Sequence, residues 1–550
     1  MVTAWNFADV WEIVAAERSR LPAIDQGSTH LNWKELDQRA DALAAMLVGV
    51  GVGRQARVAQ YLYNGPAYLV SVFASFKAGL VPVNTNYRYA ADELVYLWDD
   101  GDVKVVIFDA AFEDRVDEVR GRLPRVRAWV RVGGSEPLPD WATSYEHAIA
   151  TPVGGPVRAP WGRSGDDLLF IYTGGTTGMP KGVMWRQDDL WAILNRSGEL
   201  RYPEGGNLAD VRSVLRRPSR HPRPRLLPGP PLMHGTALFT AMSVFTSGGS
   251  VVLTDGHSFS AVEALETSAR ERVTQMTIVG DAFARPLLAE LDAAPRRWDL
   301  SSLWLMVSSG VMWSAQVKAG LARHLPWLVM VDTLGSSEAL GIGRSRSTGD
   351  STTATGGFQL GHGARVVNEH GRDVIPGSGE RGMLAVQGRG PVGYHKDPIR
   401  SASTFRIIDG ERWTVPGDWA VVNADGSLTL LGRGSGCINT GGEKVFPEEV
   451  EEILKTHPSV ADSVVVGVPD ERFGEAVVAI VEPAGGAAID EDILIGWVKD
   501  RLAGYKAPKR VLTVAGVSRA ANGKVDYRRL RQQAIETLDE PSGRRVAGPG

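Results

Sequence analysis

The amino-acid sequence predicts a large N-terminal α/β domain with parallel-rich sheets covered by helices, followed by a small, mobile α+β domain. Short runs that are apolar on both faces alternate with helical patterns along the first part of the chain, as is typical of parallel strands covered by helices. The length of 550 residues allows several domains, and 43% hydrophobic with 23% charged residues is the composition of a folded protein. A glycine-rich segment at residues 432–442 then changes the composition.

The helices and strands of the N-terminal domain follow from local patterns. Asn32 precedes Glu35 by three residues, which predicts a capped helix whose apolar face runs from Leu36 to Leu47. Short apolar runs predict strands over Val58–Tyr63, Leu168–Tyr172, Val273–Val279, Leu303–Val307 and Trp327–Val331.

Glycine and small polar residues follow four of these predicted strands. Ligands of open α/β sheets bind outside the carboxyl ends of the strands, so we expect these segments to converge on one site. The four segments are Thr173–Gly178, Gly280–Asp281, Ser308–Gly310 and Asp332–Glu338.

The glycine-rich segment contains five glycines in eleven residues, which indicates a hinge. We therefore assign the N-terminal domain to residues 1–432, the hinge to 433–436 and the C-terminal domain to 437–535, and we expect a disordered tail over 536–550. The C-terminal domain is expected to contain a helix that begins at Pro447, strands over Ser463–Val468 and Ala476–Val481, and a helix over Asp490–Leu502.

Composition excludes several classes of protein. The net charge of −4 disfavours a dedicated nucleic-acid binder. The single cysteine, Cys437, excludes an intrachain disulfide and indicates a reducing compartment. The first residues carry Asp9 and Glu12 and do not resemble a signal peptide, and the longest uncharged stretch, Leu226–Thr254, contains several prolines and is a poor membrane helix. We therefore expect a soluble, cytoplasmic protein.

The stretch Arg212–Arg225 holds six arginines and three prolines. A solvated surface loop is the favoured interpretation. The alternative is an anion site for a CoA phosphate or for a membrane surface.

The segment from Tyr172 to Val183 reads YTGGTTGMPKGV and carries the strongest local indication of chemistry. Its glycines let the backbone approach a phosphate group, while its threonine hydroxyls and its lysine suit a polyphosphate. Met179 and Pro180 stand where a Walker A loop would have glycine. The residues concerned are Thr173, Gly174, Gly175, Thr176, Thr177, Gly178 and Lys181.

This segment resembles the phosphate loop of the adenylate-forming superfamily, which includes acyl-CoA synthetases, luciferases and adenylation domains. Further segments resemble the motifs of that superfamily in the same order along the chain. They are PLMHG (Pro231–Gly235), SSGVM (Ser308–Met312), DTLGSSE (Asp332–Glu338), GD (Gly417–Asp418), LGR (Leu431–Arg433), GGEK (Gly441–Lys444) and NGK (Asn522–Lys524).

The resemblance implies a site for Mg²⁺ and ATP. The adenine is expected against Ser309, Gly310 and Val311, with Asp332 and Thr333 at its edge. Ser337 lies beside the α-phosphate, Glu338 holds magnesium, and Asp418 and Arg433 contact the ribose or a phosphate. Lys524, Thr173, Glu338 and His234 are the implied catalytic residues, with His234 in a gate beside the acyl group. In this sequence Gly174 stands where many relatives have serine.

The resemblance also implies a second half-reaction with coenzyme A. The small domain is expected to rotate about a hinge at Ser435, so that Gly441, Gly442 and Lys444 serve thioester formation. Ser435 occupies a position that is commonly Asp or Lys, so an ionic latch is absent. Dimers are common in the family, which leaves a homodimer open.

Finer resemblance points to actinobacterial ligases that activate steroid side-chain acids or long-chain fatty acids. It rests on KGVMWR (Lys181–Arg186), GDAFARP (Gly280–Pro286), LGSSE (Leu334–Glu338) and the segment Gly432–Glu451. The alternatives are a medium-chain or aromatic acid CoA ligase, an acyl-AMP ligase that loads a carrier protein, a luciferase-like monooxygenase and a silent adenylate-binding module.

Overall fold

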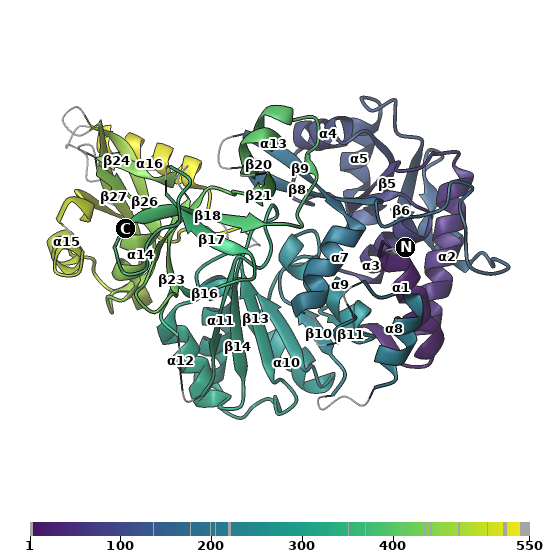
Figure 1. Ribbon diagram of the computed structural model, residues 1–550, viewed down its shortest axis with the longest axis horizontal. Coiled ribbons are helices and arrows are strands. Elements are labelled where there is room, and N and C mark those ends of the chain that lie inside the picture. Colours follow the sequence, from purple (N-terminus) through teal and green to yellow (C-terminus); the bar gives the residue numbers. More distant parts are fainter. Residues whose placement is uncertain are drawn as a thin grey trace, which may run out of the picture. The chain divides into compact units, whose positions relative to one another are not determined.

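The chain forms two compact units (Figure 1). Unit 1 comprises residues 1–354, 360–364 and 385–416, and unit 2 comprises residues 355–359, 365–384 and 417–550. The computed structural model describes all residues except 1–3, 136, 176–177, 198–199, 204, 218–221, 350, 352, 369, 409, 434–435, 441–442, 471–473, 503, 521–524 and 540–550. Residues 417–432 belong to unit 2, whereas the sequence assigns them to the N-terminal domain; a hinge at 433–436 stays a prediction.

One sheet of unit 1 has the strand order β2-β1-β11-β10-β12-β13-β14-β15. Within this order, β1, β11, β10, β12, β13 and β14 are parallel to one another. At the two ends, β2 pairs antiparallel with β1, and β15 pairs antiparallel with β14. Because β12, β13 and β14 are adjacent, their carboxyl ends share one edge, as expected. The strands are β1 (Pro22–Gln26), β2 (Thr29–Asn32), β10 (Arg225–Pro228), β11 (Ser250–Leu253), β12 (Gln275–Ile278), β13 (Leu305–Ser309), β14 (Val329–Leu334) and β15 (Gly343–Ser347).

A second sheet of unit 1 has the order β19-β9-β8-β4-β3-β5-β6-β7. The strand predicted at Leu168–Tyr172 lies in this sheet, where it pairs with β4 and with the returning strand β9, whereas β12–β14 belong to the other sheet. The strands are β3 (Arg57–Tyr61), β4 (Val81–Asn84), β5 (Val103–Asp109), β6 (Ala128–Val132), β7 (Thr143–Ser144), β8 (Leu168–Gly175), β9 (Gly178–Arg186) and β19 (Gly393–Tyr394).

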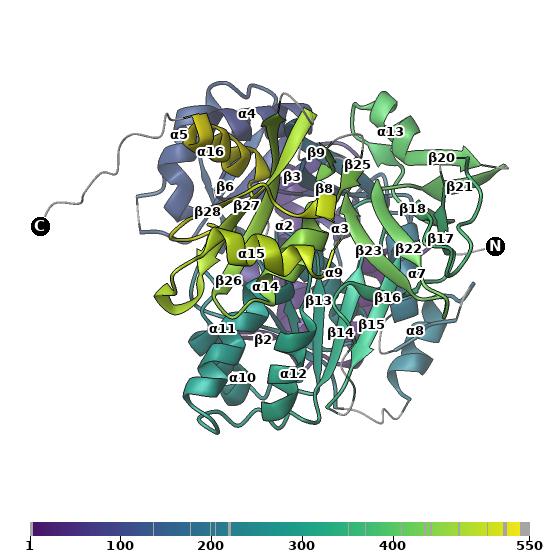
Figure 2. The same ribbon diagram turned by 90° about the vertical axis from the view of Figure 1, so that its left-hand side faces the viewer.

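Helices cover both faces of both sheets, which confirms the predicted α/β class. One core lies between the sheets, and the other two lie under α10–α12 and under α4–α5 (Figures 1 and 2). Val251 packs into the first of these cores and Val252 into the second, which explains why the strands are apolar at every position. The helices are α1 (Phe7–Glu17), α2 (Trp33–Gly49), α3 (Pro66–Lys77), α4 (Ala91–Asp100), α5 (Glu113–Arg120), α6 (Tyr145–Ala150), α7 (Gln187–Ser197), α8 (Leu208–Leu215), α9 (Gly235–Thr246), α10 (Ala261–Arg270), α11 (Gly280–Ala293), α12 (Ala315–His324) and α13 (Pro398–Thr404).

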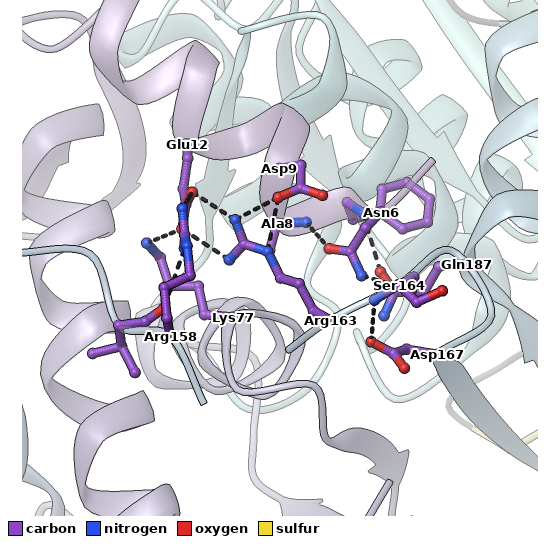
Figure 3. Close-up of polar contacts among 12 residues, drawn as sticks. Asn6, Ala8, Asp9, Glu12, Lys77, Arg158, Arg163, Ser164, Asp167 and Gln187 are labelled. Carbon is purple, nitrogen blue, oxygen red and sulfur yellow. Dashed lines mark hydrogen bonds and ion pairs between the residues drawn. The ribbon is translucent and has the colours of Figure 1, made fainter. Parts of the chain in front are cut away.

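Helix α1 is held at its N-terminus by side chains from distant parts of unit 1 (Figure 3). The Asn6 side chain caps the helix by accepting a hydrogen bond from the Ala8 N–H (2.9 Å), and its amide donates to the Ser164 carbonyl (3.0 Å). The Gln187 side chain accepts from the Phe7 N–H (3.1 Å). The start of α1 is therefore anchored to distant parts of unit 1.

A buried ionic network, here called the Lys77 cluster, joins α1, α2 and α3. The completely buried Lys77 ammonium lies 3.0 Å from Glu12, 2.8 Å from Asp37 and 2.9 Å from Asp41. Burial lowers the pKa of Lys77, but the three carboxylates together raise it. Arg158 and Arg163 join the cluster through Glu12, and Asp9 joins it through Arg163 (Figure 3).

Unit 2 contains part of an antiparallel sheet and a smaller sheet with helices on both faces. The smaller sheet has the order β25-β24-β27-β26, with β28 parallel to β27. Helices α14 and α15 pack on one face and α16 on the other. The elements are β16 (Gly357–Leu360), β17 (Ala364–Val367), β18 (Arg381–Gln387), β22 (Asp418–Val422), β23 (Leu428–Arg433), β24 (Ile438–Thr440), β25 (Glu443–Val445), α14 (Pro447–Lys455), β26 (Val460–Asp470), β27 (Gly474–Pro483), α15 (Glu491–Lys499), β28 (Arg510–Thr513) and α16 (Tyr527–Asp539). In unit 1, β20 (Phe405–Ile408) and β21 (Glu411–Thr414) extend the end of β18.

Several local predictions agree with these bounds. The capping box of Asn32 and Glu35 is present at the start of α2, and α14 begins at Pro447. Helix α16 continues to Asp539, past residue 536 where the tail was expected to begin. In the described part of the chain, every helix is too short or too polar to cross a membrane.

Candidate active site

The predicted phosphate-binding segment forms a β-hairpin. Thr173 on β8 lies opposite Lys181 on β9, and Gly175 lies opposite Gly178. This pairing places a hydroxyl group and an ammonium group on neighbouring strands, close enough for one phosphate chain to contact both. Residues 176–177, which also belong to the prediction, lie outside the described residues.

A buried amide joins this hairpin to the segment of the predicted acyl gate. The Asn84 side chain accepts a hydrogen bond from the Tyr172 N–H (2.6 Å) and donates to the carbonyl oxygens of Tyr172 (2.9 Å) and Met233 (2.7 Å). His234 follows directly and is the N-cap residue of α9. Asn84 therefore fixes the spacing between the phosphate hairpin and the gate segment. It was not predicted from the sequence, because a single asparagine at the end of an apolar run forms no recognisable pattern.

Two aromatic side chains connect the hairpin to the loop that follows β14. The Trp185 indole N–H donates to the Ser337 carbonyl (2.9 Å), and the Tyr394 hydroxyl donates to Glu338 Oε1 (2.8 Å). The Lys181 ammonium lies 5.1 Å from the centre of the Tyr394 ring. The predicted phosphate residue and the predicted magnesium residue thus meet at one side chain, Tyr394, which the sequence analysis missed.

The ends of β13 and β14 are linked by side-chain hydrogen bonds to the backbone. The Ser309 hydroxyl donates to the Thr333 carbonyl (3.0 Å), and the Thr333 hydroxyl donates to the Ser308 carbonyl (2.8 Å). Gly310 adopts a φ of +94°, a left-handed conformation that favours glycine. Val311 packs against the core under α10–α12. The backbone in the predicted adenine segment is therefore held in a defined conformation.

The turns after β12 and β13 are joined through their backbones. The Gly280 N–H donates to the Ser308 hydroxyl (2.9 Å), and the Asp281 N–H donates to the Met312 carbonyl (3.1 Å). A Cβ atom on Gly280, whose φ is +49°, would lie 2.3 Å from the Met312 carbonyl oxygen. Asp281 in turn accepts from the Ser314 N–H (2.9 Å). These contacts confirm that the two segments converge.

Asp332, predicted at the adenine edge, is one half of a buried ion pair. Its carboxylate lies 3.6 Å from the Lys318 ammonium, and the two side chains are 4% and 1% exposed. Burial raises the pKa of Asp332 to about 7, against the opposing effect of the Lys318 charge. Lys318 also donates to the Thr353 hydroxyl (3.4 Å). The sequence analysis missed Lys318, because one lysine in an amphipathic helix resembles any surface lysine.

The remaining predicted residues belong to unit 2 or lie outside the described residues. Asp418 on β22 pairs directly with Arg433 on β23. Lys444 lies on β25 opposite Asn439. Besides residues 176–177, four predicted residues lie outside the described residues: Ser435, Gly441, Gly442 and Lys524.

The fit to a divalent cation can be judged from the donors present. Within the described ranges, three or more His, Cys, Asp or Glu side chains nowhere gather in a metal-binding group. Glu338 carries one buried carboxylate, and the hydrogen bond from Tyr394 uses one of its several lone-pair positions. One carboxylate beside a phosphate hairpin suits a magnesium ion that enters with a nucleotide and keeps its phosphate and water ligands.

Known proteins are similar to this chain over almost its whole length. The family described as AMP-binding enzyme matches residues 11–393, and its C-terminal domain matches residues 449–524. A medium/long-chain-fatty-acid–CoA/3-oxocholest-4-en-26-oate–CoA ligase of Mycobacterium marinum is 38% identical, over 97% of each chain. Medium-chain acyl-CoA ligase Mig of Mycobacterium avium is 39% identical, over 97% of this chain and 99% of its own. ATP-bound MatB from Rhodopseudomonas palustris has a TM-score of 0.79 and 26% identity, over 97% of this chain and 100% of its own.

Proposed function

The chain belongs to the AMP-binding enzyme family, and we propose that it is an acid–thiol ligase that converts a carboxylic acid, ATP and CoA into an acyl-CoA thioester. The observation that supports this proposal most directly is that Lys181 and Glu338 contact the same tyrosine, Lys181 at the ring and Glu338 at the hydroxyl. We assign the ammonium group to phosphate and the carboxylate to magnesium. The two ligases of similar sequence support the choice of CoA as acceptor.

The first half-reaction forms an acyl-adenylate. A substrate carboxylate oxygen attacks the α-phosphorus of ATP, the bond from that phosphorus to the bridging oxygen breaks, and pyrophosphate leaves. Thr173 and Lys181 bind the departing phosphates, Glu338 binds the magnesium that accompanies them, and Lys524 neutralises charge at the α-phosphate. Because the protein forms no covalent bond, positioning and electrostatic stabilisation supply the rate enhancement.

Further predicted residues contact ATP in this proposal. The ends of β13 and β14 hold the adenine, with Asp332 accepting from its amino group and Ser337 lying beside the α-phosphate. Asp418 and Arg433, which are paired on β22 and β23, contact the ribose or a phosphate.

The second half-reaction transfers the acyl group. The CoA thiolate attacks the adenylate carbonyl carbon, and AMP leaves with the electrons of the mixed-anhydride bond. We assign Gly441, Gly442 and Lys444 to this step and Ser435 to the hinge between the two states. His234 is assigned to the gate between the acyl group and the nucleotide.

For the acid, we propose a medium- or long-chain fatty acid or a steroid side-chain acid. The Mycobacterium marinum relative is named for both kinds of acid, and the Mycobacterium avium relative for medium-chain acids. Magnesium as the working cation, a homodimer and a cytoplasmic location are further parts of the proposal; the single cysteine suits a reducing compartment.

The test is release of pyrophosphate and AMP from Mg-ATP with a panel of acids, each with and without CoA. The panel contains steroid side-chain acids, fatty acids of increasing length and aromatic acids. CoA-dependent turnover that is strongest on a steroid or fatty acid is the expected result. Pyrophosphate release without thioester formation would instead assign the chain to the carrier-loading class, and absence of both would refute the proposal.

A further inference from the structure

We propose that Tyr394 is a positioning residue that holds Glu338 and Lys181 together for the binding of Mg-ATP. This inference rests on the proposed function. Its starting point is that one buried side chain contacts two groups from separate parts of the fold, one on β9 and one in the loop after β14. Neither the ring nor the hydroxyl is expected to touch the reacting atoms.

The position of Tyr394 follows from a short strand pairing. β19 contains only Gly393 and Tyr394, and Tyr394 lies directly opposite Val183 of β9. Lys181 is two residues from Val183 on the same face of β9, so it is the diagonal neighbour of Tyr394. The distance of 5.1 Å from the Lys181 ammonium to the ring centre suits a cation–π contact.

The tyrosine itself is firmly held. Its N–H donates to the Ser401 hydroxyl (2.8 Å), which donates to the Asp397 carbonyl (2.6 Å). Its ring packs 5.5 Å from the ring of Phe405, and the residue is 6% exposed. A side chain fixed on three sides can transmit its own position to the groups that it contacts.

The partner of the hydroxyl is an ionisable group. A buried tyrosine hydroxyl needs an acceptor, and many such hydroxyls use a backbone carbonyl, as Tyr202 does with Thr246. Tyr394 instead donates to the Glu338 carboxylate, which is 9% exposed. Hydrogen bonds to a metal-binding carboxylate orient it, and loss of such a bond typically costs about 10–100-fold in metal affinity.

The decisive experiment measures how much Mg²⁺ strengthens nucleotide binding. Calorimetric titration with α,β-methylene-ATP, with Mg²⁺ and with EDTA, gives this gain without turnover. Tyr394→Phe keeps the ring and should reduce the gain about tenfold while metal-free affinity stays unchanged. Tyr202→Phe is the matched control, because it removes a buried hydroxyl bond elsewhere in unit 1 and should keep the full gain.

Two results would overturn the inference. One is a Tyr394→Phe protein with the wild-type gain from Mg²⁺. The other is an equal loss of affinity with and without Mg²⁺, which would mean that the hydroxyl supports nucleotide binding without acting through the metal. A double variant tests whether Tyr394 acts through Glu338. If it does, Glu338→Gln combined with Tyr394→Phe should lose no more of the Mg²⁺-dependent gain in affinity than Glu338→Gln alone. Additive losses would contradict this route.

Activity measurements separate this inference from the proposed function. Tyr394→Phe should require about tenfold more Mg²⁺ for half-maximal pyrophosphate release, yet convert supplied acyl-AMP and CoA at the wild-type rate. If the wild-type protein releases no pyrophosphate with any acid, the proposed function fails. If it does so and Tyr394→Phe has the wild-type Mg²⁺ requirement, only the role of Tyr394 fails.

Discussion

Among the regions in which unit 1 buries charge are those around Lys77 and around the candidate site. In the Lys77 cluster one ammonium faces three carboxylates at 2.8–3.0 Å, and Glu12 is further bound by Arg158 and Arg163. In the candidate site Asp332 faces Lys318 at 3.6 Å, and Glu338 accepts a hydrogen bond from Tyr394.

We infer from this difference in carboxylate partners that the Lys77 cluster serves stability and the candidate site serves function. The carboxylates around Lys77 are engaged by cations of the protein itself, so the cluster has little capacity for a ligand. The Glu338 carboxylate has one neutral donor and retains acceptor capacity for a cation. Changes in the Lys77 cluster should therefore affect unfolding and leave kinetics intact, whereas changes in the site should do the reverse.

The largest effect is expected for Lys77→Met. The substitution keeps the length of the side chain but leaves Asp37 and Asp41 without the ammonium group that they face, while Glu12 keeps Arg158 and Arg163. The loss should lower the free energy of unfolding by about 3–5 kcal/mol. Urea unfolding followed by fluorescence measures this, and Lys34→Met, at an exposed position on α2, is the control with a change within about 0.5 kcal/mol. Comparable stability of the two variants would show that the cluster is not structural.

Lys524→Ala should come next. Deleting an electrostatic donor should slow adenylate formation by about 10²–10³-fold, while thioester formation from supplied acyl-AMP and CoA continues and the unfolding midpoint is unchanged. Pyrophosphate release and thioester formation are measured separately. Lys499→Ala, on the exposed end of α15, is the control. Equal loss of both half-reactions would contradict the division of labour.

A pH effect of about one order of magnitude is expected at Asp332. If the ionised carboxylate accepts from the adenine amino group, a pKa of about 7 should weaken AMP binding about tenfold from pH 8 to pH 6. Asp332→Asn should remove this dependence. The titration of the AMP phosphate affects both proteins equally, so it cancels in the ratio of wild-type to Asp332→Asn affinity at each pH. A constant ratio would refute the role of Asp332.

The same group makes a linked prediction for stability. Its folded pKa is raised above its ordinary value of 3.8, so the folded state binds the proton more tightly. The contribution of Asp332 to the free energy of unfolding is therefore complete below about pH 4 and is lost as the pH rises through 7. Unfolding of wild type and Asp332→Asn across this range measures it, and parallel pH profiles would contradict the raised pKa.

The smallest effect is expected for Trp185→Phe. It removes one hydrogen bond to the Ser337 carbonyl, worth about 1 kcal/mol, and should raise KM for ATP about fivefold with little change in kcat. Trp191→Phe is matched, because Trp191 is equally buried and its indole N–H has no hydrogen-bond partner among the described residues. An equal rise in KM in both variants would reduce the role of Trp185 to packing.

The parts of the fold that were predictable are those that depend on local pattern. The capped start of α2, the start of α14 and the strands β12–β14 follow from nearby residues. The assignment of β8 to a second sheet was not predictable, because its apolar run resembles those of β12 and β13 and its partners are distant in sequence. Strand patterns identify strands but not their neighbours.

The residues of the candidate site also fall into those that a local pattern predicts and those that only packing brings together. Residues in glycine-rich segments, such as Thr173 and Lys181, were predicted because the chemistry needs several of them together. Asn84, Lys318 and Tyr394 were missed because each is a single residue in a different element, brought to the site by packing alone. Only three-dimensional contacts identify such supporting residues.

The contact between Gly280 and the Met312 carbonyl has a consequence for the evolution of substrate range. The turns after β12 and β13 touch at the Gly280 and Asp281 backbone and the Met312 carbonyl, and the side chains of Ser308 and Asp281 add further hydrogen bonds. Side chains in these turns other than Ser308 and Asp281 can therefore be exchanged without moving this junction, as long as residue 280 remains glycine. Under the proposed function, the junction lets acid specificity diverge while the nucleotide site keeps its geometry.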